Sequence, residues 1–206
     1  MTTVTLNARL VALQKLMTEL ACQSVSQQIL LDSLAQFCVD NLDAAFARIW
    51  LVNETEDVLI LQASRGQYTR INGTRARISI GQGSKIDKLY VAGKPHITND
   101  VLNDPGVKDK EWAQREAFVA FAGYPLIWGC QPLGVLGMYS RQTLSEDLLL
   151  LLSIFCAMAS ATIYQQRQTE HNMMQFCQVT GFKRVLLDRL IALGDDKVTV
   201  APRVRD

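Results

Sequence analysis

Cysteine is the most reactive residue type in this sequence, and its placement limits the chemistry available to the chain. The five cysteines lie far apart and none forms a Cys-x-x-Cys pair: Cys22, Cys38, Cys130, Cys156 and Cys177. Without such pairs the sequence indicates neither a disulfide framework nor a zinc site. We expect no bound metal, and we interpret the cysteines as buried thiols in a reducing cytoplasm.

The run GQGSK at 81–85 is the stretch most similar to a phosphate-binding loop. It lacks the spacing of the nucleotide-binding motifs GxxxxGK[ST] and GxGxxG. Free amides at the start of a helix could still hold an anion. A tight turn that leads into a short helix is the simpler interpretation.

Carboxylates and amides gather a little further along, at Asp100, Asp104, Asp109, Asn99 and Asn103. They could bind a cation, but their spacing does not match a calcium loop. We interpret them as solvated residues or helix caps.

Three arginines, Arg70, Arg75 and Arg77, flank the Asn72-Gly73 dipeptide. Asn-Gly is a strong signal for a two-residue hairpin turn, so we expect a strand to end near Asn72 and another to return over 76–80. The arginines could meet an acidic ligand or partner. A charged hairpin tip is the simpler interpretation.

The elements that must position these residues are easiest to recognise in the apolar stretch 119–140. Pro125, Gly129 and Pro132 interrupt it, which excludes a transmembrane helix of roughly 20 uninterrupted apolar residues. Two strands, about 119–128 and 133–141, joined by a turn fit better. Two further strands are predicted at 46–53 and 58–66.

Helices are expected at both ends of the chain. A heptad-like apolar spacing predicts a first helix with one apolar seam, formed by Leu6, Leu10, Leu13, Met17 and Leu20. A long helix after Ser145 begins apolar on nearly all sides, so it needs cover on more than one face. A last helical stretch is expected over 182–193.

Composition excludes some classes of protein. The chain has 206 residues, 49% of them hydrophobic, and a net charge of +1. Nucleic-acid and anionic-membrane surfaces need concentrated Lys and Arg, so we expect neither partner. The N-terminus has no signal-peptide pattern, which favours a cytoplasmic protein.

The order of these elements resembles a GAF domain over roughly residues 24–165. The run ISIGQGSKIDKLYVAGKPHITNDVLNDPGV is similar to the middle of that family, and FARIWLVNETEDVLIL is similar to its first hairpin. The resemblance implies an α+β fold with a central antiparallel sheet of five or six strands. Terminal helices would cover one face, and loops and short helices over 66–118 would form a ligand pocket on the other.

Several ligands and activities of the family lack their residues here. The Asn-Lys pair of cyclic-nucleotide-binding members is missing, and no cysteine lies between Cys38 and Cys130 for a bilin linkage or for the thiolate of the methionine-sulfoxide-reducing members. Haem binding would rest on His96 alone. We therefore expect no cofactor and no enzymatic activity, with a methionine-sulfoxide reductase as a distant alternative.

The resemblance nevertheless implies a small-molecule site lined by aromatic and polar groups. We expect ligand contacts from Trp50, Tyr90, His96, Asn99, Trp112, Phe121 and Tyr124. Arg48 and Trp50 share one face of their strand, opposite Ala47, Ile49 and Leu51, and that face is expected to point toward the pocket.

The terminal helices suggest how the chain associates. We divide it into a dimerisation helix at 1–23, the GAF-like domain at 24–165, and a helical extension with a polar tail at 166–206. A homodimer is expected because the apolar helices would otherwise leave a large exposed patch. Its interface is expected to contain the seam residues Leu6, Leu10, Leu13, Met17 and Leu20 with Leu151, Phe155 and Met158.

Two functions from different classes follow from these expectations. The first is a sensor that binds a small molecule and regulates another protein in trans. The second is a ligand-free scaffold for dimerisation and docking, with its pocket filled by side chains.

Overall fold

A computed structural model describes residues 5–22, 25–53 and 55–180 of the chain. The elements in chain order are α1 (Leu6–Cys22), α2 (Gln27–Asn41), β1 (Phe46–Asn53), β2 (Val58–Gly66), β3 (Arg77–Ser79), α3 (Lys85–Ala92), β4 (His96–Thr98), α4 (Lys110–Arg115), β5 (Ala120–Trp128), β6 (Gln131–Ser140) and α5 (Glu146–Thr180). The expected helix over 182–193 lies outside the described residues.

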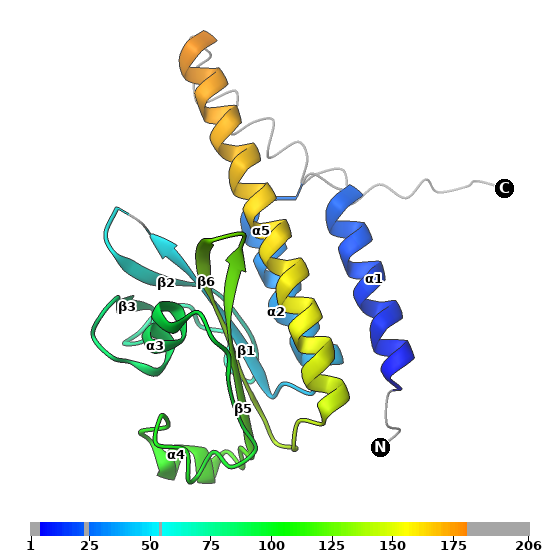
Figure 1. Ribbon diagram of the computed structural model, residues 1–206, viewed down its shortest axis with the longest axis vertical. Helices are drawn as coiled ribbons and strands as arrows, with labels where there is room; N and C mark the ends of the chain where they lie inside the picture. Colours follow the sequence, from blue (N-terminus) through cyan, green and yellow to red (C-terminus); the bar gives the residue numbers. More distant parts are fainter. Residues whose placement is uncertain (1–4, 23–24, 54, 181–206) are drawn as a thin grey trace, which may run out of the picture.

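The strands form one antiparallel sheet in the order β3-β2-β1-β6-β5-β4. Helices α2 and α5 pack on one face of the sheet, and α1 lies against both helices. The helix α3, the helix α4 and the connecting loops lie on the other side (Figure 1). The α+β fold and the antiparallel sheet expected from the sequence are confirmed.

The side chains of each central strand alternate between two cores. On β1, Ala47, Ile49 and Leu51 point into the core under the helices. Phe46 and Trp50 point into a second core on the side of α3 and α4. This alternation is the period of two that a strand imposes, and it brings the residues of the second core toward the candidate site.

The hairpin of β5 and β6 supplies β6, which is one of the two central strands of the sheet together with β1. Trp128 pairs with Gln131, so the turn consists of Gly129 and Cys130 alone. In β6, a Cβ on Gly134 would overlap the backbone carbonyl oxygen of Trp50 on β1. A residue without a side chain is therefore required at this close approach of the two strands.

The connection between β2 and β3 differs from the expected two-residue hairpin. The second strand ends at Gly66, and β3 pairs with the beginning of β2 through Val58–Ser79 and Ile60–Arg77. Residues 67–76 therefore form a long loop, in which Gly73 begins only a local turn, closed by a hydrogen bond of 3.0 Å from Ala76 N to the Gly73 carbonyl oxygen. Gly66 has a φ of +92°, and a Cβ there would lie 2.5 Å from the carbonyl oxygen of Ala45, so the chain turns away from the sheet at this residue.

Several residues expected at a dimer interface are buried inside one chain instead. Leu13 and Leu20 of α1 and Leu151 and Phe155 of α5 belong to the core under the helices, so they have no surface to offer a partner. Leu6 and Met17 pack partly against the same core. The first helix uses its apolar seam against its own domain, and this corrects the assignment of those side chains.

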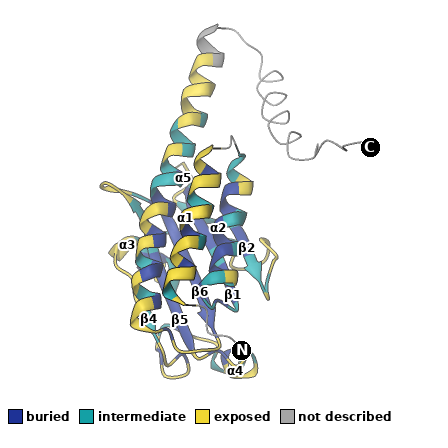
Figure 2. Cartoon of the chain, turned by 90° about the vertical axis from the view of Figure 1, so that its right-hand side faces the viewer, coloured by how far each residue is buried: buried dark blue, intermediate teal, exposed yellow. Residues whose placement is uncertain are grey.

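Other apolar side chains of the same helices do point outward. Leu10 and Met158 from the expected interface are exposed, as are Val11, Leu150 and Ile154. Figure 2 shows α1, α2 and α5 side by side, with exposed residues along their outer sides. The C-terminal part of α5 continues beyond the ends of the other helices (Figure 1).

By length and composition alone, α5 could cross a membrane. Core helices of soluble proteins meet the same criterion, and this helix covers the sheet with its buried side, including Leu152 and Phe155. Packing against the sheet and against α1 and α2 explains the apolar residues on the buried side of its first half.

Candidate ligand-binding site

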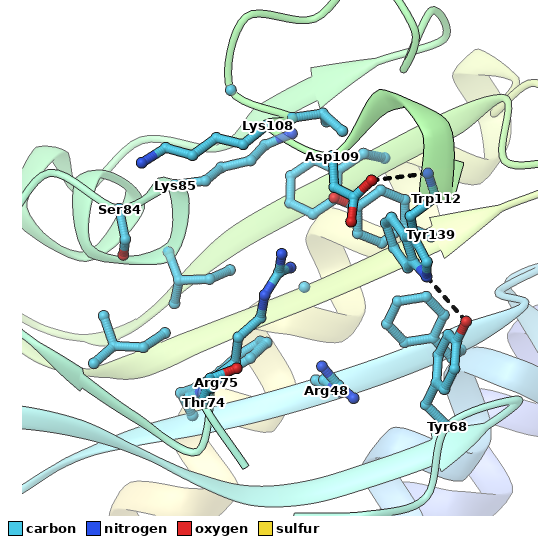
Figure 3. Close-up of a pocket in the computed structure, with 18 of the residues that line it drawn as sticks. Arg48, Tyr68, Thr74, Arg75, Ser84, Lys85, Lys108, Asp109, Trp112 and Tyr139 are labelled. Carbon is cyan, nitrogen blue, oxygen red and sulfur yellow. Dashed lines mark hydrogen bonds between the residues drawn. The ribbon is translucent and has the colours of Figure 1, made fainter. Parts of the chain in front are cut away.

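A cavity of about 620 Å³ lies on the side of the sheet away from the terminal helices. This volume is in the range of small-molecule sites in proteins, roughly 300–1,000 Å³. Its floor is formed by β1 and β6, and its walls by the loop 67–76, the start of α3 and the segment that leads into α4 (Figure 3).

Aromatic rings form one wall of the cavity. The rings of Phe46 and Tyr139, on adjacent strands, stack with centroids 5.3 Å apart. The ring of Trp112 from α4 meets Tyr139 edge-on at 5.2 Å, and its Nε1 donates a hydrogen bond of 3.0 Å to the hydroxyl of Tyr68. The hydrogen bond and the ring contacts hold these side chains in fixed orientations.

Positive charge enters the cavity from several directions. Arg48 reaches it from β1, Arg75 from the loop 67–76, and Lys108 from the segment before α4 (Figure 3). The Nε of Arg48 donates a hydrogen bond of 3.2 Å to Ser64 Oγ, and its guanidinium carbon lies 5.4 Å from the centre of the Phe46 ring. Burial, followed by the charge of Arg75, lowers the pKa of Arg48.

The loop 67–76 is held against the sheet by specific hydrogen bonds. Trp50 Nε1 donates to the carbonyl oxygen of Arg75 at 2.9 Å, and Leu61 N donates to the carbonyl oxygen of Ala76 at 2.7 Å. At its beginning, Ser64 Oγ donates to the carbonyl oxygen of Tyr68. These bonds place both Arg75 and Tyr68 beside the cavity.

Asp104 organises the loop between β4 and α4. Its carboxylate accepts hydrogen bonds from Lys85 Nζ at 2.7 Å, His96 Nε2 at 2.8 Å and Gly106 N at 2.7 Å. Burial raises the pKa of Asp104, but the hydrogen bonds and the charge of Lys85 outweigh burial and hold it well below its usual range. The carboxylate therefore stays ionised and fixes Lys85, whose Nζ lies 3.5 Å from the centre of the Phe121 ring.

The glycine turn at 81–85 is occupied by a carboxylate of the chain itself. The amides of Gly81 and Gly83 donate to Asp87 at 2.9 Å and 2.6 Å, and Ser84 Oγ caps α3 by accepting a hydrogen bond from Asp87 N. Because an internal carboxylate already uses these amides, the turn is a structural one. The simpler interpretation of this run is confirmed.

Three of the residues expected to contact a ligand line the cavity, namely Trp50, Trp112 and Phe121. Tyr90 packs against the core beneath the cavity without lining it. His96 does not line the cavity either. Its ring contacts the carboxylate of Asp104 instead, because that carboxylate lies next to β4, the strand that contains His96.

The remaining two expected residues lie elsewhere, and their placement in the pocket was wrong. The Asn99 side chain caps the start of the segment before α5, accepting from Leu144 N at 2.8 Å and donating to the Leu144 carbonyl oxygen. Tyr124 belongs to the core under the helices, where its hydroxyl donates to the carbonyl oxygen of Leu149 at 3.4 Å.

Three important lining residues were missed by the sequence reasoning: Tyr68, Lys108 and Tyr139. Tyr139 is two residues from Gly137, which pairs with the pocket-facing Arg48, so Tyr139 lies on the same face of the sheet; this register is visible only in the structure. Burial raises the pKa of Tyr139 to about 12, opposed by the charges of Arg75 and Arg48. Its hydroxyl therefore stays protonated at neutral pH and can donate.

Among the residues that the structure describes, none supplies a thiol or a metal-binding cluster at this site. None of Cys22, Cys38, Cys130 and Cys156 lines the cavity. Cys38 and Cys156 are buried under the helices, and burial raises the pKa of both thiols. Within the described parts of the chain, no group of three or more His, Cys, Asp and Glu side chains could hold a metal ion.

Comparison with known protein families shows to which of them the chain belongs. A family model described as GAF domain matches residues 24–163. The chain belongs to the GAF domain family. This match confirms the resemblance seen in the sequence and nearly reproduces its expected limits, 24–165. No match was found among curated protein sequences.

Solved structures with the same fold come from several kinds of GAF protein. The GAF domain of a phosphoenolpyruvate-protein phosphotransferase from Coxiella burnetii has a TM-score of 0.69 at 18% identity, covering 82% of this chain and 99% of its own. The GAF domain of A. aeolicus nlh2 in an inactive state has a TM-score of 0.63 at 14% identity, covering 79% and 99%.

An enzyme is also among the similar structures. The free methionine-R-sulfoxide reductase from Neisseria meningitidis, in complex with its substrate, has a TM-score of 0.65 at 18% identity, covering 82% of this chain and 96% of its own. At these identities the likeness establishes the fold alone. The GAF fold supports a regulatory or sensory domain at a general level, and the same fold also carries reductases.

Proposed function

We propose that this protein is a non-enzymatic sensor that binds a small molecule in the cavity between β1, β6 and the loop 67–76. The single observation that carries the proposal is the cavity itself, about 620 Å³ and lined by both aromatic and charged side chains. A scaffold that kept only the fold would be expected to fill this space with side chains.

The signal is proposed to pass through a homodimer in the cytoplasm to another protein in trans. The outward apolar residues of α1 and α5, among them Val11 and Leu150, would form the interface. Ligand binding would act by favouring one arrangement of the paired helices over another, which requires different affinities for the two states.

Native mass spectrometry of gently purified protein, combined with a thermal-shift screen of metabolites, tests this function. We expect a retained small molecule or a metabolite that raises the melting temperature, and a dimer in the same spectrum. The scaffold hypothesis predicts neither ligand signal, and instead a stable protein partner whose capture depends on residues 166–193.

The similarity to a sulfoxide reductase gives a second candidate function, and the cavity argues against it. A thiolate must attack the sulfoxide sulfur, and no described cysteine lines the cavity. We expect no turnover of free methionine sulfoxide. Turnover that disappears in Cys130→Ser would instead support the enzyme.

A further inference from the structure

Several groups that face the cavity without a partner are hydrogen-bond donors. Among the residues that the structure describes, no side chain pairs with the guanidinium of Arg75, the Nζ of Lys108 or the two Nη groups of Arg48, and the hydroxyl of Tyr139 makes no hydrogen bond. A ligand can reach each of these groups. Arg75 and Lys108 are exposed, and the unpaired atoms of Arg48 and Tyr139 are not fully buried, because every fully buried side-chain nitrogen or oxygen of the described residues has a partner. A ligand that satisfies them must bring acceptors.

The charges around the cavity do not balance. Arg77 pairs with Glu56, and Lys85 pairs with Asp104. The remaining cations, Arg48, Arg75 and Lys108, face Asp109 as the acidic lining residue, and one oxygen of Asp109 already caps α4 by accepting from Trp112 N at 2.8 Å. The described lining thus carries an excess of uncompensated positive charge.

This positive charge lies beside a wall of rings. The Arg48 guanidinium carbon lies 5.8 Å from the centre of the Tyr68 ring, and Tyr68 is hydrogen-bonded to Trp112. Figure 3 shows Arg48, Arg75, Tyr68, Trp112 and Tyr139 around one space. A planar ligand could therefore place its ring against the aromatic side chains and its charged group near the arginines.

We propose that the ligand of this cavity is a small planar anion, with its carboxylate or phosphate between Arg48 and Arg75 and its ring against Tyr68, Trp112 and Tyr139. The inference rests on the proposed function, since it assigns a chemical class to the ligand of the same cavity.

Electrostatics favours an anion over a neutral molecule of the same shape. Two guanidinium groups that face one space repel each other, and the pKa of Arg48 is lowered by its burial and by Arg75. An anion between them removes that repulsion and accepts charge-assisted hydrogen bonds from both. A neutral amide offers a single weaker acceptor.

Calorimetric titration of the full-length chain with matched acids and amides tests the inference. The probes are benzoate with benzamide and phenylacetate with phenylacetamide, followed by phenyl phosphate and inorganic phosphate at one salt concentration. We expect at least one aromatic anion to bind, and its amide to bind roughly 10- to 100-fold more weakly, as for the loss of charged hydrogen bonds. The phosphate probes decide which anionic group is preferred.

Three variants localise the effect. Arg75→Gln should weaken binding of the acid about tenfold or more and leave the amide unchanged. Arg70→Gln is the matched control, because Arg70 is exposed in the same loop and does not line the cavity. Tyr139→Phe keeps the ring and removes the hydroxyl, so it should weaken the acid selectively.

The outcomes separate this inference from the function on which it rests. If the amides bind as tightly as the acids, or if Arg75→Gln and Arg70→Gln lose the same affinity for the acid, the ligand is not selected as an anion. In either case a small-molecule site in the cavity still stands. If inorganic phosphate binds as tightly as phenyl phosphate, the ring contributes nothing to binding, and the proposal that the ligand is planar is overturned. If no probe binds, the inference is wrong, and the metabolite screen decides whether the sensor fails with it.

Discussion

The indole Nε1 of Trp50 donates a hydrogen bond of 2.9 Å to the backbone carbonyl oxygen of Arg75. Trp50 belongs to a central strand, whereas Arg75 lies in the loop 67–76, which contains no helix or strand. The position of an arginine at the cavity thus depends on a buried side chain of the sheet.

Replacing Trp50 by Phe keeps an aromatic ring in the core but removes the donor. We expect faster amide hydrogen exchange across 67–76 and a loss of about 0.5–1.5 kcal/mol of stability. Trp128→Phe is the control, because Trp128 is exposed at the β5–β6 turn. If amide exchange in the loop 67–76 is unchanged in Trp50→Phe, the other hydrogen bonds of the loop are enough to hold it against the sheet.

Acidification should remove the stabilisation supplied by Asp104. Its folded-state pKa lies well below its usual range because of Lys85, His96 and Gly106. A depressed folded pKa gives stability that is complete above the unfolded value, about 3.9, and is lost as the pH falls from there toward the folded value.

Asp104→Asn should therefore cost about 1.5–3 kcal/mol at neutral pH. The difference from the unmodified protein should shrink below about pH 4. Urea unfolding across this pH range measures both effects. The control is Asp100→Asn, since Asp100 is exposed and its side chain contacts the amide groups of Asn103. A difference independent of pH would contradict the role of the ionised carboxylate.

Two glycines on β6 should respond differently to the same substitution. A Cβ at Gly134 would overlap the backbone of β1, whereas a Cβ at Gly137 would lie 3.4 Å from side-chain atoms of Ile86 and Trp50. We expect Gly134→Ala to cost about 1–3 kcal/mol or more and Gly137→Ala to be tolerated. Denaturant midpoints compare the pair, and equal midpoints would be evidence against a close β1–β6 approach.

Alternation along a strand explains one success and one error of the sequence reasoning. Arg48 and Trp50 are two residues apart, and both face the cavity as expected. Phe121 and Tyr124 are three apart on β5, so they cannot share a face. The structure places Phe121 at the cavity and Tyr124 under the helices.

Tertiary contacts account for what the sequence could not reveal. Tyr68 and Arg75 reach the cavity only because the loop 67–76 follows bonds to Ser64, Trp50 and Leu61. No local pattern marks such a path. The Asn-Gly pair instead predicted a short hairpin, because local turn preference says nothing about where the preceding strand ends.

Adjacent leucines on α5 separate the proposed dimer contact from the core. Leu150 is 60% exposed on the outer side of the helix, whereas Leu151 is 1% exposed against the sheet. A glutamate at position 150 can stay solvated in a monomer but would be desolvated in an interface between two copies. Leu150→Glu should therefore give a folded monomer, measured by light scattering and circular dichroism.

Leu151→Ala is the matched comparison, because it opens a cavity inside the domain. It should lower stability by about 2–5 kcal/mol while the folded fraction still associates. The apolar start of α5 alone could not distinguish these roles in the sequence, since an apolar helix face packs equally well against its own sheet or a second copy. A Leu150→Glu protein that remains dimeric would move the interface away from the outer side of α5, and an unmodified protein that is monomeric would remove the dimer from the proposed mechanism.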